Sequence, residues 1–166
     1  MILQYWLQEF EHESENTRKL LQSIPQKDLG YRPSDISWTM GELAQHIATI
    51  WLLVCRCTLA GRLGYRERSF GTRKSKRHTG YPTLFEDNVQ KPREALSTLT
   101  KEQLSQEWTM TAGDRVVLGP MPRGIVARGF LFNHIYHHRG EMIVYLRATG
   151  NTVPGLYGPT YEVGTA

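Results

Sequence analysis

Apolar residues recur along this chain at intervals of three and four positions in four separate stretches, and this spacing predicts four amphipathic helices. We expect the first helix over Met1 to Ile24 and the second from about Trp38 to Ala60. A third helix, with sparser apolar positions, is expected from roughly Pro82 to Leu99. The fourth and most clearly periodic stretch runs from about Arg123 to Thr149. The pattern as a whole indicates an all-α fold.

The connections between these helices determine the expected architecture. Arg62 to Gly80 is longer than an ordinary helix–helix loop, as a crossover between non-adjacent bundle positions requires. Lys101 to Gly124 breaks the helical pattern, and Thr109 to Leu118 fits either a small hairpin or an irregular turn. The tail Asn151 to Ala166, rich in Pro and Gly, cannot continue a helix. We therefore predict one domain, residues 1–166, folded as a four-helix bundle with one long crossover connection.

Chain length and cysteine content favour a soluble protein of a reducing compartment. A chain of 166 residues buries roughly two-thirds of its unfolded surface without needing disulfides. Cys55 and Cys57 are two positions apart and diverge by about 200° on a helix, so we expect small core residues and no disulfide. The sequence shows neither a signal-peptide core nor an apolar run of about 18 residues. A cytoplasmic location without a membrane partner is expected.

The formal net charge of +4 comes mainly from one segment, residues 62–77. A solvated loop is the simplest interpretation of this segment, although such a charge run also attracts phosphate groups and can hold an acidic thiol cofactor. A nucleic-acid partner is unlikely, because no recognition helix or base-stacking module accompanies the charges. The basic residues are Arg62, Arg66, Arg68, Arg73, Lys74, Lys76 and Arg77, against the single acid Glu67.

Three histidines are the candidate chemistry of this chain. His134 and His138 lie four positions apart on the fourth predicted helix, so both imidazoles lie on one face, which is otherwise apolar. His46 lies on an apolar face of the second helix. Three neutral imidazoles from two helices would bind one transition-metal ion and leave positions for water or substrate, as in catalytic sites. The alternative is that each ring hydrogen-bonds within the core or lies at its rim.

The neighbouring polar residues leave alternatives open. Glu42, one turn before His46, either accepts the free N–H of a metal-bound imidazole or is a solvated helix residue. His137 is swung about 100° from His138, and it either replaces one ligand or lies at a helix interface or rim. His12 and His78 have no supporting context.

The histidines belong to longer motifs, and with them the chain resembles the DinB-like family of metal-binding four-helix bundles, which includes YfiT-like proteins and thiol-dependent S-transferase relatives. The resemblance covers nearly the whole chain and is specific in the fourth helix and the tail. The motifs are Gly41-Glu42-Leu43-Ala44-Gln45-His46-Ile47, Asn133-His134, His137-His138-Arg139-Gly140-Glu141, Tyr145-Leu146-Arg147 and Val153-Pro154-Gly155-Leu156-Tyr157-Gly158-Pro159.

This resemblance implies a divalent metal, often nickel or zinc, held by His46, His134 and His138. It also implies a homodimer, for which Trp6 and Trp51 are candidate exposed apolar residues. Relatives often carry Gln at the position of Glu141, so this chain adds a carboxylate close to His138.

The leading functional hypothesis is a metal-dependent enzyme. The metal would activate water or a low-molecular-weight thiol, for hydrolysis of a small electrophilic substrate or for transfer to it. The catalytic residues and the cofactor-binding residues beyond the metal ligands are left unassigned. The alternative is a non-catalytic metal-binding protein of a stress or DNA-damage response, because fold alone does not choose a reaction.

Overall fold

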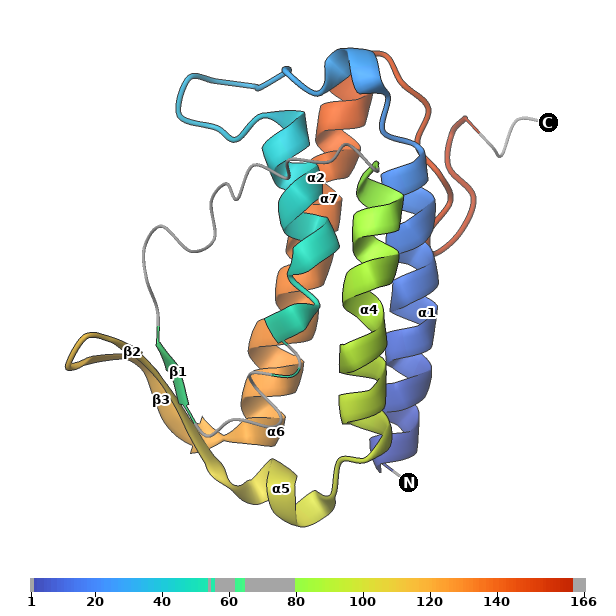
Figure 1. Ribbon diagram of the computed structural model, residues 1–166. Coiled ribbons are helices and arrows are strands. Elements are labelled where there is room, and N and C mark those ends of the chain that lie inside the picture. The colour runs from blue at the N-terminus through green and yellow to red at the C-terminus, as the bar shows by residue number, and fades with distance from the viewer. Residues whose placement is uncertain (1, 54, 56–61, 65–79, 163–166) are drawn as a thin grey trace.

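A computed structural model describes residues 2–53, 55, 62–64 and 80–162 of the chain. Four helices form the body of the molecule: α1 (Ile2–Gln22), α2 (Met40–Thr49), α4 (Tyr81–Ser97) and α7 (Asn133–Ala148). They lie with their long axes roughly aligned (Figure 1). Helix α4 packs against both α1 and α2, and α2 packs against α7. The predicted four-helix arrangement is therefore confirmed.

A small sheet accompanies the helices, so the all-α prediction is wrong in this respect. Its strands are β1 (Arg62–Gly64), β2 (Glu107–Ala112) and β3 (Arg115–Pro122), in the order β1-β2-β3. The antiparallel pair β2 and β3 is the hairpin that the sequence left open, and Gly113 takes a positive φ of 59° at its turn. Strand β1 pairs in parallel with β2 and begins the segment predicted as a loop.

The sheet was missed because β1 is only three residues long. Its single buried side chain, Leu63, lies between two exposed neighbours. Such a pattern is too short to indicate a strand until a partner is in place. Residues 65–79, the rest of the predicted basic connection, lie outside the described residues.

The second predicted helix begins later than its apolar pattern suggests. Thr39 is the N-cap of α2, and its hydroxyl accepts a hydrogen bond from the backbone N–H of Glu42. The Glu42 carboxylate accepts in return from the backbone N–H of Thr39, which completes a capping box. Trp38 therefore precedes the helix. Beyond α2, residues 52, 53 and 55 are again helical, and the predicted end at Ala60 lies outside the described residues.

The fourth predicted helix is helical from Arg123 onward, but it is not an α-helix throughout. It begins as α6 (Arg123–Ile125), continues as the π-helix η2 (Val126–Phe132) and becomes α7 at Asn133. A π-turn accommodates one more residue than an α-turn, and such segments are frequent at functional sites. Two further short elements are the 3-10 helix η1 (Gln26–Asp28) and the helix α5 (Lys101–Ser105).

Large aromatic and aliphatic side chains fill the space between the helices. Trp51 is completely buried, with its ring edge-on to Phe10 at 5.0 Å and to Phe85 at 6.0 Å. It is a core residue, so the prediction that it is exposed for dimer contact is wrong. The Cys55 thiol is half-buried and free, whereas Cys57 lies outside the described residues.

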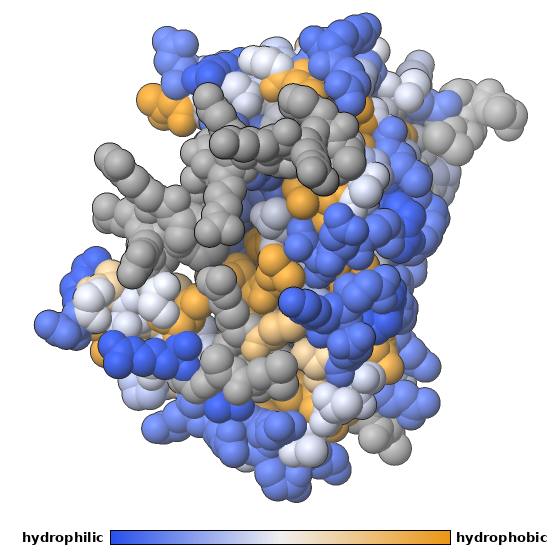
Figure 2. Space-filling model, in the orientation of Figure 1, coloured by the Kyte–Doolittle hydropathy of each residue, from blue (hydrophilic) through white to orange (hydrophobic). Residues whose placement is uncertain are grey.

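Hydrophilic side chains predominate along the α1 and α4 side of the face seen in Figure 2, with smaller hydrophobic patches between them. In the described part of the chain, every helix is too short or too polar to cross a membrane.

Candidate metal centre

The three predicted ligands come together between two neighbouring helices. His46 is on α2, and His134 and His138 are on α7, which lies beside α2 (Figure 1). The ring centroid of His46 lies 4.4 Å from that of His138 and 5.4 Å from that of His134. The centroids of His134 and His138 are 4.6 Å apart. One ring nitrogen from each residue lies within 4.8 Å of the other two, so the three imidazoles surround one point.

Local helix geometry explains this convergence. The four-residue spacing of His134 and His138 stacks their rings along α7, immediately after the π-helix ends. His46 lies two turns after the N-cap Thr39, on the side of α2 that also carries the buried Leu43 and Ile47. The packing of α2 against α7 then brings the third ring to the first two.

Burial keeps the three rings neutral. It lowers the pKa of His46 to about 3, with smaller contributions from the neighbouring His138 and His134. Burial likewise lowers the pKa of His134 to about 4, followed by repulsion from His138 and His137. For His138 burial again lowers the pKa, and the hydrogen bond to Glu141 opposes the shift. Neutral imidazoles are the form that binds metal ions.

The polar atoms of the cluster fit a metal ion. The buried Nδ1 of His134 has no hydrogen-bond partner among the described residues. Leaving such a nitrogen unpaired costs about 1–3 kcal/mol. In contrast, Nδ1 of His138 lies 2.6 Å from a carboxylate oxygen of Glu141. A cation between the rings would be bound by imidazole nitrogens, which suit zinc and nickel.

Two aromatic side chains border the histidines. The indole of Trp38 is stacked on the His138 ring, with centroids 5.7 Å apart and planes 21° apart. The centroid of the indole also lies 4.9 Å from that of the His46 ring, with the planes 65° apart. The ring centroid of Phe130 lies 5.2 Å from that of His134. Trp38 is 38% exposed, so the site lies close to the surface of the protein.

Trp38 was missed in the sequence as a residue of the site. It precedes the first residue of α2 and therefore does not belong to the helical period that identifies His46. Its backbone carbonyl accepts a hydrogen bond from the Tyr145 hydroxyl at 3.0 Å, which ties it to α7. Tyr145 belongs to the helix-four motif, but no pattern along the chain links it to Trp38.

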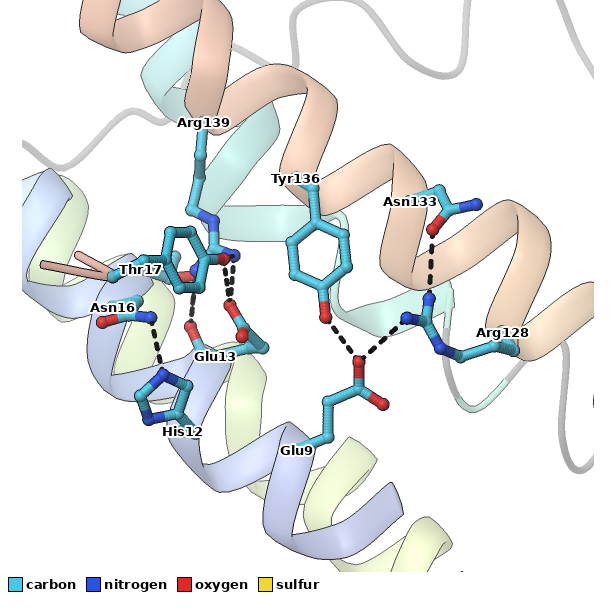
Figure 3. A network of polar contacts seen from close by, with 10 residues as sticks. Glu9, His12, Glu13, Asn16, Thr17, Arg128, Asn133, Tyr136 and Arg139 are labelled. Carbon is cyan, nitrogen blue, oxygen red and sulfur yellow. Dashed lines mark hydrogen bonds and ion pairs between the residues drawn. The ribbon is translucent and has the colours of Figure 1, made fainter. Parts of the chain in front are cut away.

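The remaining candidates lie elsewhere. The Glu42 carboxylate is hydrogen-bonded to Thr39, and this bond lowers its pKa, so Glu42 is a capping residue of α2 rather than a partner of His46. The side chain of His137 is 64% exposed and lies at the rim, where it forms a second group with His138 and Glu141 whose potential ligand atoms lie within 4.8 Å of one another. His12 contacts Asn16 on α1 (Figure 3). His78 lies outside the described residues.

The opposite side of α7 carries a buried polar network that holds this helix against α1 (Figure 3). Arg139 is 2% exposed and forms an ion pair with the buried Glu13. It also donates to the backbone carbonyl of Glu13 at 3.0 Å. The hydroxyl of Tyr157, from the tail, donates to the Glu13 carboxylate at 2.7 Å. One turn of α1 earlier, Glu9 accepts from the Tyr136 hydroxyl at 2.6 Å.

The basic segment contributes one described contact. Arg62 donates through its guanidinium to the hydroxyl of Thr111 at 3.1–3.2 Å, across the β1–β2 pair. The other six basic residues lie between 65 and 79, outside the described residues.

The chain is similar to known proteins over almost its whole length. A sequence model of the DinB family matches residues 2–165. The protein YrdA of Bacillus subtilis is 31% identical over 161 residues, which cover 96% of this chain and 90% of YrdA.

Solved structures of similar proteins also align with most of this chain. The crystal structure of a DinB-like protein from Bacillus cereus aligns with a TM-score of 0.65 at 31% identity, covering 91% of this chain and 95% of that protein. YfiT from Bacillus subtilis, described as a probable metal-dependent hydrolase with an unusual four-helix bundle topology, aligns with a TM-score of 0.66. Its sequence identity is 17%, with 90% of this chain and 89% of YfiT covered, so this likeness shows the fold alone.

Proposed function

Because the chain belongs to the DinB family, we propose that it is a metal-dependent enzyme that binds one divalent transition-metal ion through His46, His134 and His138. Nickel and zinc, which the family resemblance implies, are among the ions that imidazole ligands suit. The observation that carries the proposal is the convergence of three imidazoles from two helices on one point, with His46 and His138 buried and His134 partly buried.

The composition of the ligand set supports a catalytic ion rather than a purely structural one. Structural zinc sites use four protein ligands, whereas catalytic sites use three and leave a position open. Among the described residues, no fourth His, Cys, Asp or Glu joins this group of three. Three neutral ligands also leave the charge of the ion uncompensated, which favours an anionic ligand at the open position.

A divalent ion at this site would lower the pKa of a water or thiol ligand and so supply a nucleophile near neutral pH. The side chains of the protein would define the space in which that nucleophile meets its substrate. Trp38, partly exposed and stacked on His138, offers an apolar surface to a small electrophile. Phe130 adds a second apolar surface beside His134.

The choice between hydrolysis and thiol transfer depends on the nucleophile. The description of YfiT as a probable metal-dependent hydrolase favours water. The resemblance to thiol-dependent S-transferase relatives favours a low-molecular-weight thiol. The same site serves both reactions, because only the ligand at the open position differs.

A metal-reconstituted activity screen tests the proposal. The full chain is stripped of metal, reloaded with zinc or nickel, and assayed for hydrolysis of activated esters and amides and for reaction of small thiols with a panel of electrophiles. The controls are the metal-free protein and His134→Ala. Thiol-dependent turnover that both controls lose would establish transfer, and thiol-independent turnover that both lose would establish hydrolysis.

One result would contradict the enzymatic proposal. If no substrate is turned over in a metal-dependent way, and the structure of the metal-loaded protein shows a fourth protein ligand, the protein is a non-catalytic metal-binding protein.

A further inference from the structure

Glu141 lies one helical turn after His138 on α7 and contacts the edge of the histidine cluster. One carboxylate oxygen lies 2.6 Å from Nδ1 of His138, and the other lies 3.5 Å from Nε2 of His137. The Glu141 side chain is 43% exposed, whereas that of His138 is 10% exposed. The carboxylate therefore reaches from the solvent-exposed rim of the site to one buried ring.

The chemistry of the two groups determines the direction of this hydrogen bond. A carboxylate at neutral pH only accepts hydrogen bonds, so the shared proton belongs to Nδ1 of His138. A neutral imidazole carries one N–H, and its other nitrogen keeps a lone pair. For His138 that nitrogen is Nε2, which is left to bind a cation.

His134, the other proposed ligand on α7, lacks such a partner. The residue three positions after His134 is His137, which offers no carboxylate. Within the described chain, the buried Nδ1 of His134 has no hydrogen-bond partner at all. A carboxylate therefore determines the tautomer of His138 but not that of His134.

We infer that Glu141 is a positioning residue, which fixes the tautomer and orientation of the His138 ring and so strengthens Nε2 as a metal ligand. The inference rests on the proposed metal site, but it concerns a residue outside the ligand set. Partners of this kind orient a ligating imidazole and raise its basicity, and their loss weakens metal binding about 10- to 100-fold.

The first test is the zinc affinity of three variants of the full chain, measured by competition with a chromophoric chelator near neutral pH. We expect Glu141→Ala to weaken zinc binding about 10- to 100-fold. Glu141→Gln should lose less, because its amide oxygen still accepts the proton of His138 although the charge is gone. His137→Ala, which removes the other contact of Glu141, is the matched control and should bind zinc as the wild type does. Thermal unfolding checks that each variant is folded.

The second test requires no metal. In ¹⁵N NMR spectra of the histidine rings in the metal-free full chain, His138 should carry its proton on Nδ1 in the wild type and in Glu141→Gln. In Glu141→Ala the ring should shift toward the Nε2–H form, which a merely structural role of Glu141 would not cause.

Two results would overturn the inference. One is an Nε2–H tautomer of His138 in the wild type. The other is an equal loss of zinc affinity in Glu141→Ala and His137→Ala, because Glu141 would then act together with His137 as a ligand pair. If the wild type binds neither zinc nor nickel, the proposed function fails, and the ring spectra still decide whether Glu141 holds the proton of His138.

Discussion

At the scale of single residues, the proposed metal site depends on three imidazoles that come from two helices. His138→Ala removes one of three nitrogen ligands and should reduce the bound metal from about one ion per chain to near zero, because two imidazoles on separate helices bind a divalent ion far more weakly. Elemental analysis of protein purified without an affinity tag or chelator measures this. His12→Ala, on α1 and away from the cluster, is the control and should retain the ion. A wild type that stays metal-free after zinc or nickel is added would contradict the prediction.

The buried histidines also make the stability of the metal-free protein depend on pH. The pKa values of His46 and His134 are lowered from 6.5 to about 3 and about 4. Between these values and pH 6.5, the unfolded chain therefore binds protons that the folded chain does not. Stability should therefore be independent of these two groups above about pH 6.5 and decrease as the pH falls toward 4.

Urea unfolding of the metal-free protein at a series of pH values measures this dependence. The double variant His46→Gln/His134→Gln should show a flatter decrease between pH 6.5 and 4 than the wild type. Equal slopes in the two proteins would show that other groups cause the acid sensitivity.

At the scale of secondary-structure elements, the N-terminus of α2 determines where His46 is placed. Thr39→Ala removes the side-chain acceptor of the capping box and should lower the free energy of unfolding by about 1 kcal/mol. Thr100→Ala removes the same kind of cap from α5, which has five residues and buries none of them, and should cost less. Urea denaturation compares the two. A larger loss in Thr100→Ala would mean that α5, rather than α2, limits the stability of the fold.

The sequence predicted the four helices and the clustering of three histidines better than it predicted the details of either. His134 and His138 were placed on one face because helical periodicity is local, and the apolar face of α2 brought His46 into the prediction. Trp38 was missed because it contacts the rings from outside any helix, and β1 was missed because its partner is 47 positions away. The role of Glu42 was left open because a capping glutamate and a glutamate near a ligand have the same spacing.

The π-helix could not be predicted either. Residues 126–132 show a helical apolar pattern, and the difference between α and π hydrogen bonding produces no clear signal in sequence. Its place directly before His134 means that the turn leading into the site is wider than an α-turn.

At the scale of the whole molecule, the tail fixes the packing of α7 against α1. Burial, followed by the hydrogen bond to Glu13, raises the pKa of the Tyr157 hydroxyl to about 12. Tyr157 is 66% exposed, but its hydroxyl donates to the buried Glu13 carboxylate, so Tyr157→Phe should lower the free energy of unfolding by about 0.5–1.5 kcal/mol. Tyr5→Phe changes a tyrosine of α1 that is similarly exposed, at 60%, and should have little effect. If both variants unfold at the same urea concentration as the wild type, the tail contact does not stabilise the fold.

We also propose that the protein is a homodimer, as its resemblance to relatives implies. Trp51 no longer supports this proposal, because it lies in the core, so the contact surface must involve other residues. Multi-angle light scattering over a concentration series should give twice the chain mass of 19.1 kDa. A single-chain mass up to high micromolar concentration would contradict the proposal.

The network around Arg139 has a consequence for how the molecule is made. Glu13, Arg139 and Tyr157 are synthesised in this order, with Arg139 126 positions after Glu13 and Tyr157 18 positions after Arg139. Until Tyr157 is synthesised, a nascent chain can bury Arg139 and Glu13 only without one of their partners. The hydrogen bond from Tyr157 to Glu13 can therefore form only after the tail has been translated. A chain that stops after α7 would keep the ion pair between Arg139 and Glu13 but lack this bond.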